Sequence, residues 1–150
     1  MKRISQIKPA ELLGYSGLVP LYGCLLMLYF TWPGETGDVV LRTEVLYSAI
    51  ILAFLGGTRW GIAMMAGPNY QQIGALMLTT LPALVAWLVL FVGPVHQILI
   101  LMAGFGLAFI ADRLIARKGF VPDWYEHMRL SLTLLFEIGL AATLVRILSH

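Results

Sequence analysis

Residues 54–61 read FLGGTRWG and place one arginine, Arg59, inside an apolar segment that covers 46–66. The segment contains no other charged residue. A helix needs about twenty residues to cross a bilayer, and this segment is long enough. An arginine near the centre of a membrane helix costs about 2.5–3.5 kcal/mol even on the most lenient insertion scale. Arg59 therefore marks either a buried ion pair that organises the fold or a site that contacts a ligand, lipid or partner.

The composition around this segment is that of a membrane protein. The chain has 150 residues, of which 59% are hydrophobic and 12% are charged, and its mean hydropathy is +0.84. A soluble domain carries about 25% charged residues, so this chain has too few to cover a water-exposed surface. The net charge of +2 is too small to indicate nucleic-acid binding. The only cysteine, Cys24, excludes an intramolecular disulfide.

Five apolar segments, each close to the length of a membrane helix, are separated by turn-forming residues. They cover 12–30, 46–66, 73–92, 95–116 and 130–148. We therefore predict an all-α membrane protein in which 1–150 form a single domain, a bundle of five transmembrane helices. Pro20 and Pro82 fall inside segments, where a kink is tolerated. The first segment lacks a small-x-small cleavage site after it, so we expect it to be retained rather than removed as a signal peptide.

The turns and helix starts also carry signals. Gly93-Pro94 makes so tight a connection that the third and fourth segments are expected to be antiparallel neighbours. Asp123 and Glu126 have the spacing of an N-cap and its capping-box partner, which predicts a helix that opens just outside the membrane.

Basic residues divide unequally between the two ends of these segments. Seven lie on the side of the N-terminus: Lys2, Arg3, Lys8, Arg113, Arg117, Lys118 and Arg129. Two, Arg42 and Arg146, lie on the other side. The excess predicts a cytoplasmic N-terminus and a C-terminus on the far side of the membrane. Aromatic residues at the expected membrane interfaces include Trp60, Trp124 and Tyr125.

This topology gathers ionisable side chains in the cytoplasmic half of the membrane. Residues spaced by four share one face of a helix, which aligns the polar side chains of the last segment. The predicted intramembrane polar cluster consists of Arg59, Asp112, Arg113, Arg129, Thr133 and Glu137. Two interpretations stay open. Either Arg59 pairs with Glu137 or Asp112 and locks helices together, or the cluster forms a pocket that binds an anionic group or exchanges protons.

Small residues at a spacing of four predict where helix backbones approach each other in lipid. The second segment has such a face at Ala49, Ala53, Gly57 and Gly61, and the fourth has one at Gly104 and Ala108. Arg59 is expected to point away from the face on its own segment, because two residues correspond to about 200° around a helix.

Motifs for metal or covalent chemistry are lacking in the sequence. His96 and His127 are expected at opposite sides of the membrane and His150 is terminal, so they are not expected to share a metal or haem. No phosphate-binding loop, nucleophile elbow or zinc-protease pattern is present. We therefore expect no metal, no cofactor and no enzymatic activity.

The segment 47–61, with its Gly-Gly-x-Arg-Trp-Gly core, resembles the signature of a family of small five-span membrane proteins of unknown function, which includes mitochondrial transmembrane protein sixty-nine. Residues 14–20, GYSGLVP, look like that family's opening motif. Asp112-Arg113 and Trp124-Tyr125 followed by Arg129 look like its later landmarks. The resemblance implies a protein of the bacterial inner membrane or its mitochondrial descendant, and it offers no established reaction. No import sequence is evident before the first apolar segment, which favours the bacterial setting.

We expect a small, non-catalytic accessory, assembly or scaffold subunit in an energy-transducing membrane. Its partners would be the lipid bilayer and a larger membrane complex or a second copy, docked through the small-residue faces. The alternative is a carrier or binder of a small anionic or amphipathic molecule, such as a lipid or quinone, through Arg59 and Glu137.

Overall fold

Every element in the described part of the chain is helical, which confirms the all-α class. The computed structural model describes residues 4–65, 73–119 and 121–149, and all of their side chains except those of 4–8, 73–76 and 123. The elements are α1 (Ile4–Ser16), α2 (Val19–Thr31), α3 (Glu35–Met65), α4 (Ile73–Leu88), the short 3-10 helix η2 (Val89–Phe91), α5 (Pro94–Ala116) and α6 (Asp123–Leu148).

The first predicted segment is broken into α1 and α2. The break falls at residues 17–18, and Pro20 lies in the first turn of α2, where the missing N–H of a proline is not needed. Tyr47 of α3 donates a hydrogen bond of 2.5 Å from its hydroxyl to the carbonyl of Gly17. This bond satisfies a backbone acceptor that the break leaves free and fixes the junction of the two helices against α3.

Two helices begin earlier than the apolar pattern predicts. α3 starts at Glu35 rather than at residue 46, with Glu35 and Asp38 in its first turn, where acidic side chains interact favourably with the helix dipole. α6 starts at Asp123 rather than at residue 130, which confirms the helix start that the spacing of Asp123 and Glu126 predicted. The residue that caps α6 is Pro122 and it provides no side-chain cap bond, so the predicted N-cap at Asp123 is wrong. Glu126 instead pairs with Arg113.

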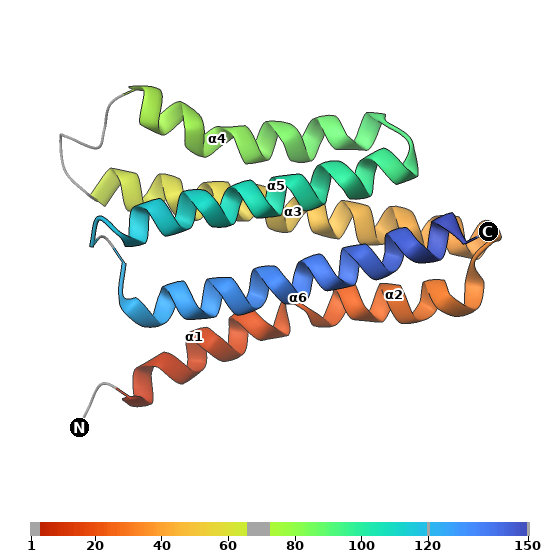
Figure 1. Ribbon diagram of the computed structural model, residues 1–150, viewed down its shortest axis with the longest axis horizontal. Coiled ribbons are helices and arrows are strands. Elements are labelled where there is room, and N and C mark those ends of the chain that lie inside the picture. The colour runs from red at the N-terminus through yellow and green to blue at the C-terminus, as the bar shows by residue number, and fades with distance from the viewer. Residues whose placement is uncertain (1–3, 66–72, 120, 150) are drawn as a thin grey trace.

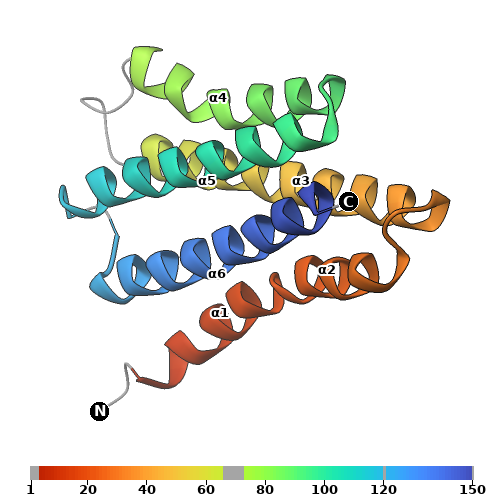
Figure 2. The ribbon, with the colours of Figure 1, turned by 45° about the vertical axis from the view of Figure 1, so that its right-hand side comes forward.

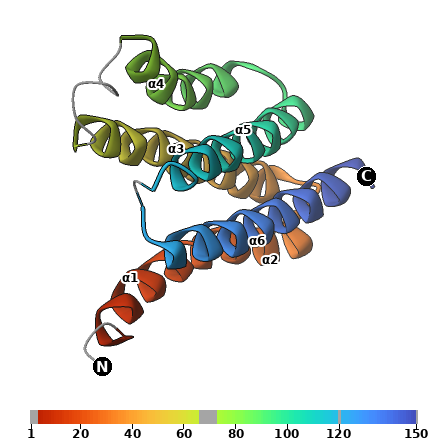
Figure 3. The same ribbon diagram turned by 60° about the vertical axis from the view of Figure 1, so that its left-hand side comes forward.

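The helices form a bundle in which α3 and α6 each contact several neighbours. α3 packs against α2, α4 and α5, while α6 packs against α5, α2 and α1 (Figures 1 and 2). α4 lies at the outer edge of the bundle beside α3 and α5, as Figure 3 also shows. The centre is filled by fully buried apolar side chains such as Leu21, Leu52, Leu101, Phe105 and Leu140.

The outer surface of the bundle is also apolar. Large side chains including Phe30, Phe54, Met65, Leu107 and Val145 are mostly exposed. Within the described residues, four stretches are long and apolar enough to cross a membrane: Pro9–Thr31, Glu35–Met65, Pro94–Ala116 and Trp124–Leu148. The apolar helix Met77–Phe91 is shorter than these four. The chain is therefore a helical, multi-pass membrane protein whose exposed apolar surface suits contact with lipid.

Candidate functional site

A buried carboxylate lies between two arginines from different helices. Arg129 Nε of α6 lies 2.7 Å from Asp112 Oδ2 of α5, and Arg59 Nη1 of α3 lies 3.5 Å from Asp112 Oδ1. The exposed fractions of Arg59, Asp112 and Arg129 are 3%, 5% and 6%. We call these three residues the Arg-Asp-Arg triad. Of the two partners that the sequence left open for Arg59, the structure therefore has Asp112.

Small residues on α5 let α3 come close enough to form the triad. Besides its ion pair with Asp112, Arg59 Nη1 donates a hydrogen bond of 2.8 Å to the carbonyl of Ala108, one turn before Asp112. Gly104 lies one helical turn before Ala108, and a Cβ added to it would lie 2.8 Å from Cδ2 of Leu52 on α3. These two positions lie where α3 and α5 meet, as a small-residue face allows.

The triad carries an excess positive charge. Two guanidinium groups share one carboxylate, which leaves one positive charge uncompensated within the triad. Three guanidinium nitrogens, Nε and Nη2 of Arg59 and Nη2 of Arg129, are buried without a hydrogen-bond partner among the described residues. A buried charge and a buried unpaired donor are both unfavourable. The triad is therefore short of one anionic or hydrogen-bond-accepting group.

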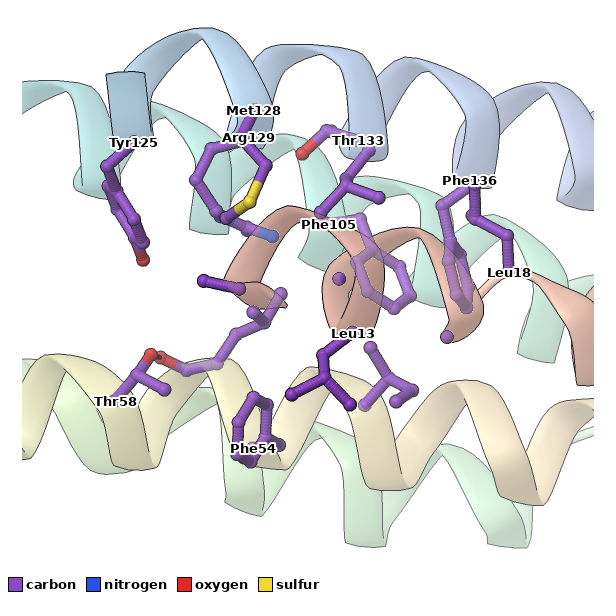
Figure 4. Close-up of a pocket in the computed structure, with 16 residues that line it drawn as sticks. Leu13, Leu18, Phe54, Thr58, Phe105, Tyr125, Met128, Arg129, Thr133 and Phe136 are labelled. Atoms are coloured by element: carbon purple, nitrogen blue, oxygen red, sulfur yellow. Dashed lines mark hydrogen bonds between the residues drawn. The ribbon is translucent and has the colours of Figure 1, made fainter. Parts of the chain in front are cut away.

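A cavity of about 360 Å³ adjoins the triad at Arg129. Residues from α1, α3, α5 and α6 and from the break before α2 line it (Figure 4). Its polar side chains are Thr58, Tyr125, Arg129 and Thr133, and the Oγ1 of Thr133 is buried without a hydrogen-bond partner in the described structure. The remaining side chains that line the cavity are apolar, so one cavity combines a polar part with an apolar part.

The cavity reaches the outer surface of the bundle between α1 and α3. Leu13 of α1 and Phe54 of α3 both line it and are 74% and 64% exposed. Gly14, near the end of α1, and Gly17, in the break that follows, also border the cavity. Because the surrounding surface is apolar, this opening faces the region that lipid chains would occupy.

Two residues of the predicted polar cluster lie outside the triad and cavity. Arg113 forms an exposed ion pair with Glu126, with 3.0 Å between Nε and Oε1. Glu137 is half-buried and forms no ion pair among the described residues. It lies eight residues beyond Arg129 on α6, or about 12 Å along the helix axis. The polar face of α6 therefore contributes Arg129 and Thr133 to the site but not Glu137, and of the two carboxylates considered as partners of Arg59 only Asp112 pairs with it.

The predicted small-residue face of α3 does not continue along the helix as one packing surface. Ala49 is buried and Ala53 is half-buried, whereas Gly57 and Gly61 are exposed, with open space around an added Cβ. The close approach occurs at Gly56, where a Cβ would lie 2.6 Å from the carbonyl oxygen of Thr79 on α4. One residue turns a helix by about 100°, so this glycine faces a different neighbour from Gly57.

The aromatic residues expected at the membrane interface have different surroundings. Trp60 is exposed on α3, and Trp124 and Tyr125 are half-buried at the start of α6. The Tyr125 hydroxyl is directed into the cavity towards Thr58 (Figure 4). The sequence reasoning missed Thr58 and Tyr125 as residues of the site. Their positions in the sequence could have indicated them, because Thr58 directly precedes Arg59 and Tyr125 lies one helical turn before Arg129.

A metal site is not found in the part of the chain that the structure covers. No group of three or more His, Cys, Asp or Glu side chains there is placed to hold an ion. His150 lies outside the described residues. The polar groups that the cavity offers to a bound molecule are one guanidinium group, two threonine hydroxyls and one phenol, which suit an organic anion.

Comparison with known proteins agrees with the motif at residues 47–61. The model of a family described as "Protein of unknown function (DUF3429)" matches residues 6–145. Transmembrane protein 69 of Xenopus tropicalis is 35% identical over 144 residues, which are 92% of this chain and 54% of the relative. Transmembrane protein 69 of Mus musculus is 29% identical over the same share of this chain and 56% of its own length.

The chain thus spans about half the length of these curated relatives. No solved structure matches it. The family model covers nearly the whole chain, including all three residues of the Arg-Asp-Arg triad. The chain therefore belongs to the DUF3429 family of membrane proteins of unknown function.

Proposed function

We propose that this protein binds a small amphipathic molecule with an anionic head group in the cavity beside the Arg-Asp-Arg triad. One observation carries the proposal: two buried arginines share a single carboxylate, and three of their nitrogens have no partner in the described structure. An anion placed next to Arg129 would balance the excess charge and accept a hydrogen bond from Nη2. Arginine suits this role because its planar guanidinium can donate two parallel hydrogen bonds to two oxygens of one carboxylate or phosphate group.

The rest of the cavity suits an apolar tail. Its volume of about 360 Å³ is at the lower end of the range in which small molecules bind. Phe105 and Phe136 pack together with 4.3 Å between ring centroids and form part of the wall. The hydroxyl of Thr133, which has no partner in the described structure, offers a further hydrogen bond near the head group. The proposed ligand is thus a single-chain carboxylate or phosphate monoester.

The opening between α1 and α3 gives such a ligand a direct path from the membrane. Leu13 and Phe54 border the opening and are exposed to the surroundings of the bundle. An amphipathic molecule of the bilayer can therefore enter sideways through this opening without first passing into bulk water. The break at residues 17–18 lets α1 pack on α6 independently of α2 and keeps this side open.

The proposal is tested by titrating the detergent-solubilised protein with a fluorescent fatty acid and with a fatty alcohol that has the same chain. We expect Arg129→Gln to weaken binding of the acid at least about tenfold, the effect of losing about 1.4 kcal/mol. Binding of the uncharged alcohol should change little. Arg113→Gln is the matched control, because this arginine is exposed and lies outside the cavity. Equal affinity of the wild type and Arg129→Gln for the acid would contradict the proposal.

A second variant separates ligand binding from folding, since Arg129→Gln also removes an ion pair of the triad. Leu13→Trp adds bulk at the rim of the cavity and leaves the triad intact. We expect it to reduce binding of both acid and alcohol while the unfolding transition stays unchanged. A lysophospholipid with a phosphate monoester head, used as competitor, distinguishes a phosphate site from a carboxylate site.

A structural role is the second candidate, favoured by the exposed small residues on α3. Gly57 and Gly61 leave open space on the outer surface, where the backbone of another helix can approach. In this proposal the protein is a non-catalytic accessory, assembly or scaffold subunit that docks onto a larger complex of an energy-transducing membrane or onto a second copy. We propose no enzymatic activity in either case, because the site combines cations and hydroxyls without a candidate general base beside a nucleophile.

Purification in mild detergent followed by mass spectrometry discriminates the two candidates. A binder should retain a stoichiometric lipophilic anion, and Arg129→Lys should release it because lysine loses the paired contacts of a guanidinium. A scaffold should retain another membrane protein and tolerate Arg129→Lys. Retention of a protein partner together with the absence of any small molecule would favour the scaffold.

We further propose that the chain crosses a bacterial inner membrane five times, with its N-terminus in the cytoplasm. The excess of basic residues on the side of Arg113 and Arg117 supports this orientation. A Cys24→Ser background with single cysteines placed at Gly34 and Lys118 provides the test. The Gly34→Cys site should react with an impermeant thiol reagent added outside intact cells, and the Lys118→Cys site should not. The reverse pattern would refute the orientation.

A further inference from the structure

A second buried polar site lies towards the other end of α3. Glu44 is 0% exposed and lies fifteen residues before Arg59, or about 22 Å along the helix axis. Its Oε1 accepts a hydrogen bond of 2.6 Å from Oγ1 of Thr143 on α6. The salt bridges of the described residues all involve Asp112 or Glu126, so none of them balances a charge on Glu44. An isolated carboxylate in such surroundings is strongly unfavourable.

Two buried oxygen atoms at this site have no partner in the described structure. They are Oε2 of Glu44 and Oγ of Ser48, which is also fully buried. Ser48 lies one turn after Glu44, so both side chains are on the same face of α3. An ionised carboxylate only accepts hydrogen bonds, whereas a carboxylic acid also donates one through its O–H. A proton on Oε2 therefore removes the uncompensated charge and turns this oxygen from an acceptor into a donor.

We propose that Glu44, Ser48 and Thr143 form an intramembrane proton-binding site in which Glu44 is a neutral carboxylic acid at physiological pH. Thr143 donates a hydrogen bond to one carboxyl oxygen and the other oxygen carries the proton, while Ser48 lies one turn away on the same face of α3. The site is separate from the cavity and the triad, and it does not depend on what the cavity binds.

No cationic side chain of the described residues pairs with Glu44, so a proton is what neutralises its carboxylate. On α2, Cys24 is half-buried and is the titratable side chain that faces Glu44. On α6, Arg146 donates from Nη2 to the backbone carbonyls of Tyr29 and Trp32, at 3.1 and 2.6 Å. Among the described residues, neither α4 nor α5 places a charged group against Glu44.

Infrared spectroscopy of the detergent-solubilised protein tests the protonation state without any reagent having to reach the site. We expect the wild type at neutral pH to show the carbonyl stretch of a protonated carboxyl, and Glu44→Gln to lose it. Glu126→Gln is the matched control, because the half-buried Glu126 is paired with Arg113 and should lose the band of an ionised carboxylate instead. Loss of a carboxylate band in Glu44→Gln would overturn the proposal.

The same spectra distinguish a proton from a metal cation. Carboxylate and hydroxyl oxygens also bind alkali ions. Wild-type spectra recorded with sodium, lithium or choline chloride should keep the protonated band unchanged. Conversion of that band into a carboxylate band by sodium or lithium would show that the occupant is a metal ion and would overturn the assignment to a proton. Because Glu44→Gln keeps the shape of the side chain and its amide can donate, we expect this variant to fold.

Discussion

The two ends of the bundle hold buried polar groups in different ways. At one end, Asp112 lies between Arg59 and Arg129, and a cavity adjoins the surplus charge. At the other end, Glu44 has a single hydrogen bond from Thr143 and lies in a tightly packed region. There, for example, a Cβ on Gly139 would come within 2.7 Å of Leu21. A membrane bundle can thus keep ionised groups buried if they pair, or keep a lone acid buried if it is neutral.

This contrast has consequences for substitution. An ionised triad is sensitive to the loss of one member, because the remaining charges stay buried without compensation. A neutral acid is sensitive only to the loss of its hydrogen bonds, which contribute less. Free energies of unfolding, measured by titrating the protein in mixed micelles with sodium dodecyl sulfate, compare the two ends directly.

Asp112→Asn is expected to have the largest effect. It leaves two guanidinium groups with no negative partner in the triad, and removal of one member of a buried ion pair costs about 3–5 kcal/mol. The free energy of unfolding should fall by this amount. Adding Arg129→Gln should recover part of the loss, because it removes one of the stranded charges. Strict additivity of the two changes would mean that the triad is not coupled, and the contrast between the ends would fail.

Thr143→Val tests the other end and is expected to cost about 1–3 kcal/mol, because one oxygen of Glu44 loses its donor. Tyr22→Phe is the matched control, since it removes a 2.7 Å hydrogen bond from a neutral hydroxyl to the carbonyl of Leu135 between α2 and α6. If Glu44 is neutral, both variants should lose similar amounts. A loss in Thr143→Val that equals the loss in Asp112→Asn would indicate an ionised Glu44 and would erase the difference between the two ends.

The sequence predicted the triad end better than the Glu44 end. Arg59 interrupts an apolar segment, so its burial and the candidacy of Asp112 followed from spacing and depth alone. Glu44 precedes residue 46, where the apolar pattern begins, and lies near Glu35, Asp38 and Arg42. Charge density therefore indicated a loop, whereas α3 already begins at Glu35. Hydropathy averages over a window and cannot show that one acid among several faces the core.

The sequence also did not predict the cavity or the residue at which α3 comes closest to α4. The cavity depends on the break between α1 and α2 and on how α1 leans on α6, which a hydropathy pattern does not encode. The small-residue spacing selected Gly57, but the position against α4 is Gly56. Adjacent glycines differ by about 100° around the helix, and only the placement of α4 decides which one is covered.

Gly56→Ala and Gly57→Ala form a matched pair that separates helix propensity from packing beside the triad. An added methyl at Gly56 meets the backbone carbonyl of Thr79, which cannot rotate away, so we expect a loss of about 1–2 kcal/mol despite the better helix propensity of alanine. At Gly57 the space is open, and the variant should gain up to about 1 kcal/mol. A loss at Gly57 would instead reveal a partner on this face.

Arg113→Ala is expected to have the smallest effect and isolates burial from charge. Arg113 and Glu126 belong to α5 and α6, the same two helices as Asp112 and Arg129, yet their ion pair is exposed. Exposed pairs contribute about 0–1 kcal/mol, and added salt screens them. Arg113→Ala should lower the free energy of unfolding by less than about 1 kcal/mol, and high salt should reduce this loss further. The loss caused by Asp112→Asn should persist in high salt. If instead Arg113→Ala destabilised the protein as much as Asp112→Asn, the contribution of the triad to stability would come from linking α5 to α6 and not from its buried charge.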